Sequence, residues 1–257
     1  ASELKGGLDA AEARQLAQKA TKNAEAQAEY EAGRREWNKR SKEGFDNAIK
    51  HFEKAIELDP DYADAYAGLA DTYGLMPAYN FASPDDAMPK AKSYAEKAIE
   101  KNPNLASAYT SLAWVLHNYE YDWKGAEENY SKAIELNSNY ATVNHWFGIF
   151  LSNNGRHNKA IETVKKAAEL DPQSMIIQYT VGQMLLVAEQ SEEALKYVER
   201  AHKMNPYFSS ALWFKFSKLT KVNTDKDIAY LKEAIKRFPD QPMHRKTLLE
   251  VYLKMGN

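Results

Sequence analysis

The sequence predicts an all-α protein, a right-handed superhelical solenoid of about six helix-turn-helix units. Three observations support this prediction. First, a hexapeptide of the form Ala-Ile-Glu-Leu-Asp-Pro recurs with slow variation, at residues 55–60, 98–103, 133–138, 167–172, 201–206 and 234–239. Second, the last residues of successive copies lie 43, 35, 34, 34 and 33 residues apart, a period near 34 with one insertion. Third, apolar residues between the copies recur at helical spacing in two blocks, which indicates two helices per unit.

Each hexapeptide is expected to end a helix, because the residue before proline avoids the helical conformation and proline has no N–H to donate. The helix pairs then fall near residues 62–75 and 85–101, 104–119 and 123–136, 139–153 and 157–170, 173–188 and 191–204, and 207–221 and 225–237. Ahead of them, residues 44–58 are predicted to form the second helix of a pair whose first helix lies within 24–39. A last, unpaired helix is predicted from about residue 241 to 255.

Small residues occupy two positions of each unit where the paired helices are expected to cross closely. The eighth position holds Ala70, Ala113, Gly148 and Gly182, and the twentieth holds Ala91, Ala126, Ala160 and Ala194. Phe216 takes the eighth position of the next unit, so we expect a wider crossing there.

Composition and charge exclude several classes of function. With 34 Lys and Arg against 36 Asp and Glu, the net charge is −2, and no basic stripe is present, so this chain is not expected to bind DNA or RNA. No run approaches the roughly 18 apolar residues of a membrane-spanning helix, so we expect a soluble chain with no membrane insertion. The absence of cysteine fits cytoplasm and periplasm equally. Because the first residue is not Met, we expect a fragment of a longer protein.

A 34-residue helix-turn-helix period ending in proline resembles the tetratricopeptide repeat (TPR). The chain is particularly similar to the C-terminal TPR region of multidomain bacterial regulators, in the segments YEAGR (30–34), WNKR (37–40), AIKHF (48–52), DYADAYAGLA (61–70), DWKGAE (122–127) and NYATVNHW (139–146). In such proteins the array follows an output domain, which is a winged-helix DNA-binding domain, a protein kinase or an adenylate cyclase, often with a TolB-like segment between. The resemblance implies that 1–29 is a helical lead-in or interdomain joint and that 30–257 is the TPR array.

One interruption lengthens the turn inside a hairpin by nine residues, at 76–84. Ser83 followed by Pro84 and two acids predicts the start of the next helix. Tyr79 and Phe81 lie on this loop. They are expected either to pack back onto their own repeat or to contact a partner as a lid over the binding groove.

The sequence shows no pattern of a reactive site. It has no glycine-rich phosphate loop, no Gly-x-Ser-x-Gly and no His-Glu-x-x-His, so we expect no enzyme, no catalytic residue and no cofactor. His117 and His145 are predicted to face the same way on neighbouring units, with an axial offset of about 10 Å. Imidazoles that far apart cannot share a zinc ion bound at roughly 2 Å, so no metal site is expected.

The predicted functional surface is the concave wall, which the first helix of each unit lines. Its inward positions give the predicted partner-binding residues Thr110, Trp114, His117, His145, Tyr179, Gln183 and Trp213. The aromatic members offer large, rigid contact areas to a peptide or helix of a partner. Trp114 and Trp213 equally suit packing between neighbouring units. The basic and amide residues of a chaperone-type carboxylate clamp are missing from these positions.

These features predict a non-catalytic scaffold that binds a protein or peptide in its groove, as the regulatory part of a larger signalling or transcription-regulating protein. Two alternatives stay open. In one, the groove and the Tyr79 and Phe81 loop enclose a small molecule. In the other, the chain forms a homo-oligomer through apolar residues of its last helix, namely Leu248, Leu249, Val251, Tyr252 and Leu253.

Overall fold

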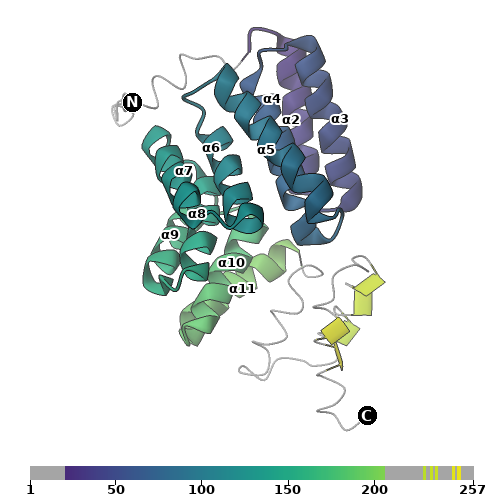
Figure 1. Cartoon of the computed structure of the whole chain (residues 1–257). Coiled ribbons are helices and arrows are strands. Elements are labelled where there is room, and N and C mark those ends of the chain that lie inside the picture. Colours follow the sequence, from purple (N-terminus) through teal and green to yellow (C-terminus); the bar gives the residue numbers. More distant parts are fainter. Residues whose placement is uncertain are drawn as a thin grey trace, which may run out of the picture. The chain divides into compact units, whose positions relative to one another are not determined.

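The described residues of the computed structural model are 21–205, together with short stretches at 228–229, 232–233, 235–236, 245–246 and 248–249. Every regular element among them is helical (Figure 1). This confirms the predicted all-α solenoid of helix-turn-helix units. The chain divides into two compact units, Ala1–Val143 and Asn144–Asn257, and each is described by itself. The helices predicted at 207–221, 225–237 and 241–255, together with Phe216 and most of the apolar residues named for self-association, lie outside the described residues.

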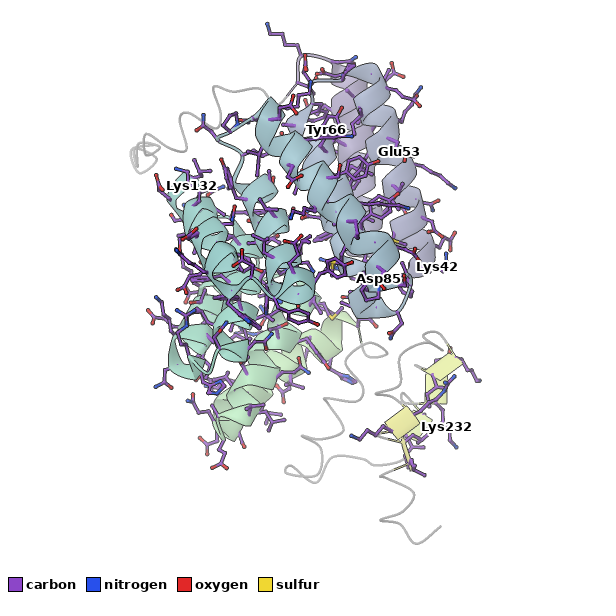
Figure 2. All side chains as sticks on the ribbon, in the orientation of Figure 1. Lys42, Glu53, Tyr66, Asp85, Lys132 and Lys232 are labelled. Atoms are coloured by element: carbon purple, nitrogen blue, oxygen red, sulfur yellow. The ribbon has the colours of Figure 1, made fainter. Side chains whose placement is uncertain are left out.

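Unit 1 is built from stacked helical hairpins. They are α2 (Ala24–Asn38) with α3 (Lys42–Leu58), α4 (Ala63–Leu75) with α5 (Pro84–Lys101), and α6 (Ala106–Val115) with α7 (Trp123–Leu136). The two helices of each hairpin pack along each other, α3 also packs on α4, and α5 on α6. The first helices α2, α4 and α6 form a second row of contacts. Lys42 and Glu53 on α3 and Asp85 on α5 stand on the exposed faces of these hairpins (Figure 2).

Unit 2 continues the same pattern. Its described helices are α8 (Ala141–Asn153), which begins just before the boundary between the units, α9 (His157–Leu170), α10 (Met175–Val187) and α11 (Ser191–Met204). Helix α10 packs against both α9 and α11. In both units the observed helix ends lie within two residues of the predicted ones, when the π-helical turn Leu116–Glu120 that continues α6 is included.

The second helix of every described hairpin ends in the same way, on an Asp or Asn whose backbone has left the helical conformation. These residues are Asp59, Asn102, Asn137, Asp171 and Asn205. In the first three, the side-chain oxygen accepts a hydrogen bond of 3.0 to 3.1 Å from the backbone N–H two residues on. This turn explains why the helix before Ser138 stops as cleanly as the others, although proline is replaced there. The stop therefore comes from the Asp or Asn as well as from proline.

The third hairpin contains one extra residue, and the structure shows where it goes. The interval between hexapeptides is 35 residues there, and α6 continues into a π-helical turn, η2 (Leu116–Glu120). A π turn holds one more residue than an α turn, so it absorbs an insertion without shifting the helices on either side. Tyr121 then closes the turn in the left-handed conformation, with φ 56°.

The nine-residue insertion packs back onto the protein. It forms a short 3₁₀ turn, η1 (Pro77–Tyr79). The rings of Tyr79 and Phe81 both meet Phe45 of α3 edge-on, at centroid distances of 5.7 and 5.8 Å. Ser83 caps α5 by accepting the Asp86 N–H at 3.1 Å, which confirms the predicted helix start.

The close crossings predicted from small residues are confirmed. A Cβ added at Gly148 would lie 2.3 Å from Cγ1 of Val164, and one added at Gly182 would lie 2.6 Å from Cγ2 of Val198. The alanines named for the eighth and twentieth positions, Ala70, Ala113, Ala91, Ala126, Ala160 and Ala194, are all buried. Only a very small side chain fits where the two helices of a hairpin cross.

Candidate functional site

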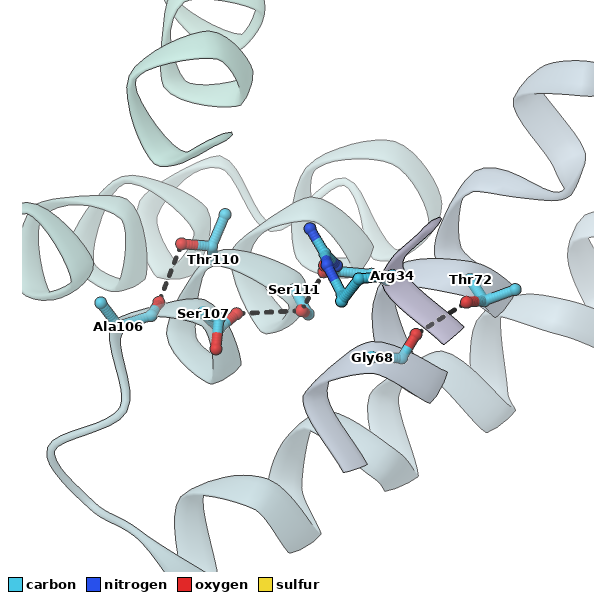
Figure 3. Close-up of polar contacts among 8 residues, drawn as sticks. Arg34, Gly68, Thr72, Ala106, Ser107, Thr110 and Ser111 are labelled. Carbon is cyan, nitrogen blue, oxygen red and sulfur yellow. Dashed lines mark hydrogen bonds and ion pairs between the residues drawn. The ribbon is translucent and has the colours of Figure 1, made fainter. Parts of the chain in front are cut away.

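In unit 1 the predicted groove residues Thr110, Trp114 and His117 are all buried, with exposures of 0%, 7% and 2%. The Thr110 hydroxyl donates to the Ala106 carbonyl at 2.8 Å, within its own helix (Figure 3). The Trp114 indole N–H donates to the Gly74 carbonyl at 2.8 Å, so this ring joins α6 to α4. The structure therefore places Trp114 between neighbouring hairpins of unit 1.

In unit 2 the predicted residues join α8 to α10 and line the surface of α10. His145 Nε2 lies 2.9 Å from the Thr180 hydroxyl. That hydroxyl donates its one proton to the Ile176 carbonyl at 2.9 Å, so the imidazole N–H is the donor to Thr180. On the same helix, Gln183 Nε2 donates to the Tyr179 hydroxyl at 3.1 Å. Trp213 lies outside the described residues. The assignment of these residues to a partner-binding groove stays a prediction.

A buried polar ladder crosses the first helices of unit 1, and sequence reasoning missed most of it. Asp71 on α4, 1% exposed, accepts from the Arg34 guanidinium of α2 at 2.9 Å and from the Ser111 hydroxyl of α6 at 2.6 Å. Figure 3 shows Arg34 and Ser111 meeting at this point. Burial raises the pKa of Asp71, whereas Arg34 and Ser111 act to lower it. The sequence did contain a signal for the contact between Arg34 and Asp71. Gly33 occupies the eighth position of α2, so Arg34 occupies the ninth, which is also the position of Asp71 on α4.

Unit 2 contains a pocket of about 730 Å³. Helices α8, α9 and α10 form it, and its lining includes Thr180 and the predicted residue Gln183. Side chains near the hairpin turns complete its rim, among them Asn153, His157 and Val187, and all three are exposed. The lining mixes amides and hydroxyls with aliphatic side chains such as Ile149. Such a surface can form hydrogen bonds with a peptide backbone and at the same time bind an apolar side chain.

The burial of His117 makes the stability of unit 1 depend on pH. Burial lowers the pKa of this imidazole from its ordinary 6.5 to about 4. The unfolded chain therefore takes up a proton at higher pH than the folded chain, and the contribution of His117 to stability is complete above pH 6.5. It is lost as the pH falls from 6.5 towards 4, by about 3 kcal/mol at most.

We therefore expect His117→Gln to flatten the decline in free energy of unfolding between pH 7 and pH 4. Urea unfolding at several pH values measures this decline. The matched control is His157→Gln, because His157 is exposed. If both variants keep the wild-type decline, burial of His117 is not its cause.

Within residues 21–205 and the short stretches described beyond them, no three His, Asp or Glu side chains gather as they would to hold a metal ion. No helix in this part of the chain is long and apolar enough to cross a membrane.

Hairpins of two helices with small crossing residues, a common helix stop and a period near 34 define a helical-repeat protein of the TPR type. Comparison with protein families gives the same result. Family models match residues 39–76 as a TPR repeat and residues 129–162 as a tetratricopeptide repeat. The chain thus contains tetratricopeptide repeats. No curated protein sequence matches it.

Solved structures show the same fold. Pseudomonas aeruginosa PilF aligns with a TM-score of 0.57 at 16% identity, covering 88% of this chain and 97% of that one. A thermophilic TPR protein of Thermus thermophilus aligns with a TM-score of 0.55 at 19% identity, covering 70% and 92%. A chain of the APC/C hetero-tetramer Cut9–Hcn1 aligns with a TM-score of 0.60 at 15% identity, covering 79% of this chain and 39% of that one. At these identities the likeness concerns the fold alone.

Proposed function

We propose that this chain is a non-catalytic scaffold that binds a protein or peptide segment. The observation that supports this proposal is the pocket of about 730 Å³ in unit 2. Its rim is exposed at Asn153, His157 and Val187, so a bound chain can enter and continue on either side. Stacked helical repeats present extended surfaces of this kind to their partners.

Peptide selection followed by affinity measurement tests the proposal. Peptides are selected from a random phage-displayed library on the purified chain, labelled with a fluorophore and titrated by anisotropy. Val187→Asp introduces a charge at an apolar rim position that is 77% exposed, so the fold tolerates it. We expect this variant and Gln183→Ala to weaken binding at least tenfold, about 1.4 kcal/mol.

Tyr121→Asp is the matched control, because Tyr121 is 69% exposed and belongs to unit 1. Its affinity should equal that of the wild type. If Val187→Asp and Gln183→Ala bind as tightly as this control, or if no peptide is selected, the pocket is not the binding site.

A second candidate function follows from the volume of the same pocket. Small-molecule sites measure about 300 to 1,000 Å³, and this pocket falls inside that range. A metabolite that binds there raises the melting temperature by mass action. A thermal-shift screen in which Val187→Asp cancels the shift would favour the small-molecule sensor over the peptide scaffold.

The wider biological role is proposed from the resemblance to multidomain bacterial regulators. On that basis the array is the regulatory part of a larger signalling or transcription-regulating protein, and 1–29 joins it to the preceding domain. Sequencing the gene upstream of the codon for Ala1 tests this. A winged-helix, kinase or cyclase domain there would support the proposal, and a start codon directly before Ala1 would contradict it.

A further inference from the structure

Arg40 is a buried turn residue with left-handed backbone. In the other described hairpins, the turn residue with this backbone is exposed. Arg40 joins α2 to α3 with φ 51°. The residues with the same left-handed backbone in later hairpin turns are Asn80, Tyr121, Gly155 and Glu189, and all four are exposed. Arg40 is only 8% exposed. Something specific to the first hairpins of unit 1 therefore covers this guanidinium.

The insertion at 76–84 lies in the neighbourhood of Arg40. Tyr79 of this segment is close enough to Arg40 to interact with it electrostatically, and its ring is itself buried against Phe45. Burial lowers the pKa of Arg40 to about 10, and Tyr79 acts in the opposite direction. Arg40 thus keeps its positive charge at neutral pH although it is buried.

Two buried donors in this cluster lack acceptors. Nη1 of Arg40 and the indole Nε1 of Trp37 are buried with no hydrogen-bond partner. The two side chains touch, since the guanidinium carbon of Arg40 lies 3.4 Å from the centroid of the Trp37 ring. The ring face compensates part of the positive charge, but it offers no lone pair to either donor. Native proteins rarely leave such groups unsatisfied, and an ordered water, an ion or a ligand usually completes them.

The charges around the cluster indicate the kind of ligand. Arg34 also lies over the Trp37 ring, at 4.1 Å, but its guanidinium is already paired with Asp71. Arg34 and Arg40 are cations and Asp71 is an anion, so these three groups together carry one net positive charge. A single negative charge balances it. Two donors on adjacent side chains also match the two oxygens of a carboxylate.

We propose that Trp37 and Arg40 form a carboxylate-binding site, which opens when Tyr79 swings aside. The carboxylate accepts from Arg40 Nη1 and from the indole N–H of Trp37. Its source is either an acidic side chain of a peptide or a free small carboxylate. The site belongs entirely to unit 1, whereas the pocket of the proposed function belongs to unit 2, so either can fail without the other.

Titration followed by nuclear magnetic resonance tests the proposal on the full chain. The probe is N-acetylglutamate, added to ¹⁵N-labelled protein at constant ionic strength, and the Trp37→Phe variant identifies the Trp37 indole signal. We expect a saturable downfield shift of that signal, and none with N-acetylglutamine. Arg40→Met should weaken binding at least tenfold. The control Tyr121→Met, which introduces methionine at an exposed turn position, should leave binding unchanged.

The source of the carboxylate is resolved by a second probe, the capped peptide acetyl-Gly-Ser-Glu-Ser-Gly-amide. Binding at least tenfold tighter than N-acetylglutamate indicates a peptide ligand, and equal binding indicates a free carboxylate. If Arg40→Met fails to fold, Trp37→Phe replaces it as the test, because this variant keeps an aromatic ring and loses only the indole donor. Its affinity for the carboxylate, measured from the Arg40 guanidinium signal, should be several-fold lower than that of the wild type. No saturable shift, an equal shift with chloride, or an unchanged response in Arg40→Met would overturn the proposal. Val187→Asp should leave the response intact.

Discussion

Phe52→Ala is expected to lower the free energy of unfolding by about 3 to 5 kcal/mol, the usual cost of removing a buried aromatic ring. Phe52 is fully buried on α3, and two glycines from two other helices enclose it. A Cβ added at Gly33 of α2 would lie 2.6 Å from the ring, and one added at Gly68 of α4 would lie 2.7 Å from it. The ring is thus a wedge shared by both hairpins, and its loss leaves a cavity that rigid helices cannot close.

Urea unfolding followed by circular dichroism measures this effect. The control Tyr121→Ala removes a ring that is 69% exposed and should change the free energy of unfolding by no more than about 0.5 kcal/mol. Gly33→Ala should destabilise by about 1 to 3 kcal/mol through overpacking. The pair Gly33→Ala with Phe52→Leu should cost less than the sum of the two single changes, because the smaller side chain gives the new methyl room. A Phe52→Ala loss below about 1 kcal/mol, on the same scale, would show that the site collapses after all.

Over residues 21–205 the fold could be predicted almost completely from the sequence because its determinants are local and repeated. A stop residue, a small crossing residue and an apolar stripe recur in every hairpin that the structure describes, and each acts within its own hairpin. The same features located the irregularities: the insertion at 76–84 and the extra residue of the third unit are visible as departures from 34. The spacing did not predict how the helix accommodates that extra residue, which is by the π turn Leu116–Glu120.

The candidate site was less predictable, since it depends on which side chains from neighbouring hairpins contact each other. Register placed Trp114 on an inward position, but only the structure shows its N–H bonded to the Gly74 carbonyl. Inward positions were assigned only from the second hairpin on, so the helix predicted within 24–39 contributed no candidates, and Arg34, Trp37 and Arg40 were not named. The burial of Arg40 depends on the tertiary packing around its turn, which no spacing rule describes.

Asp71→Ala should be about as harmful as the loss of Phe52, for an electrostatic reason. Asp71 is 1% exposed and accepts hydrogen bonds from Arg34 and Ser111. Without it the guanidinium of Arg34, whose side chain is 24% exposed, loses its counter-charge beside the cation of Arg40. Removal of one partner of a buried ion pair costs about 3 to 5 kcal/mol, and urea unfolding measures the loss.

Two further variants separate the charge effect from simple loss of contact. In the double variant Arg34→Met with Asp71→Leu, both charges are gone, and most of the stability should return, since apolar residues of similar size often replace a buried pair at little cost. The exposed pair of Lys42 and Asp46 has the same kind of contact, at 2.9 Å, so Asp46→Ala should cost less than about 1 kcal/mol. If the double variant is as unstable as Asp71→Ala, the ladder stabilises unit 1 through its hydrogen bonds and packing, and the uncompensated guanidinium is not the cause.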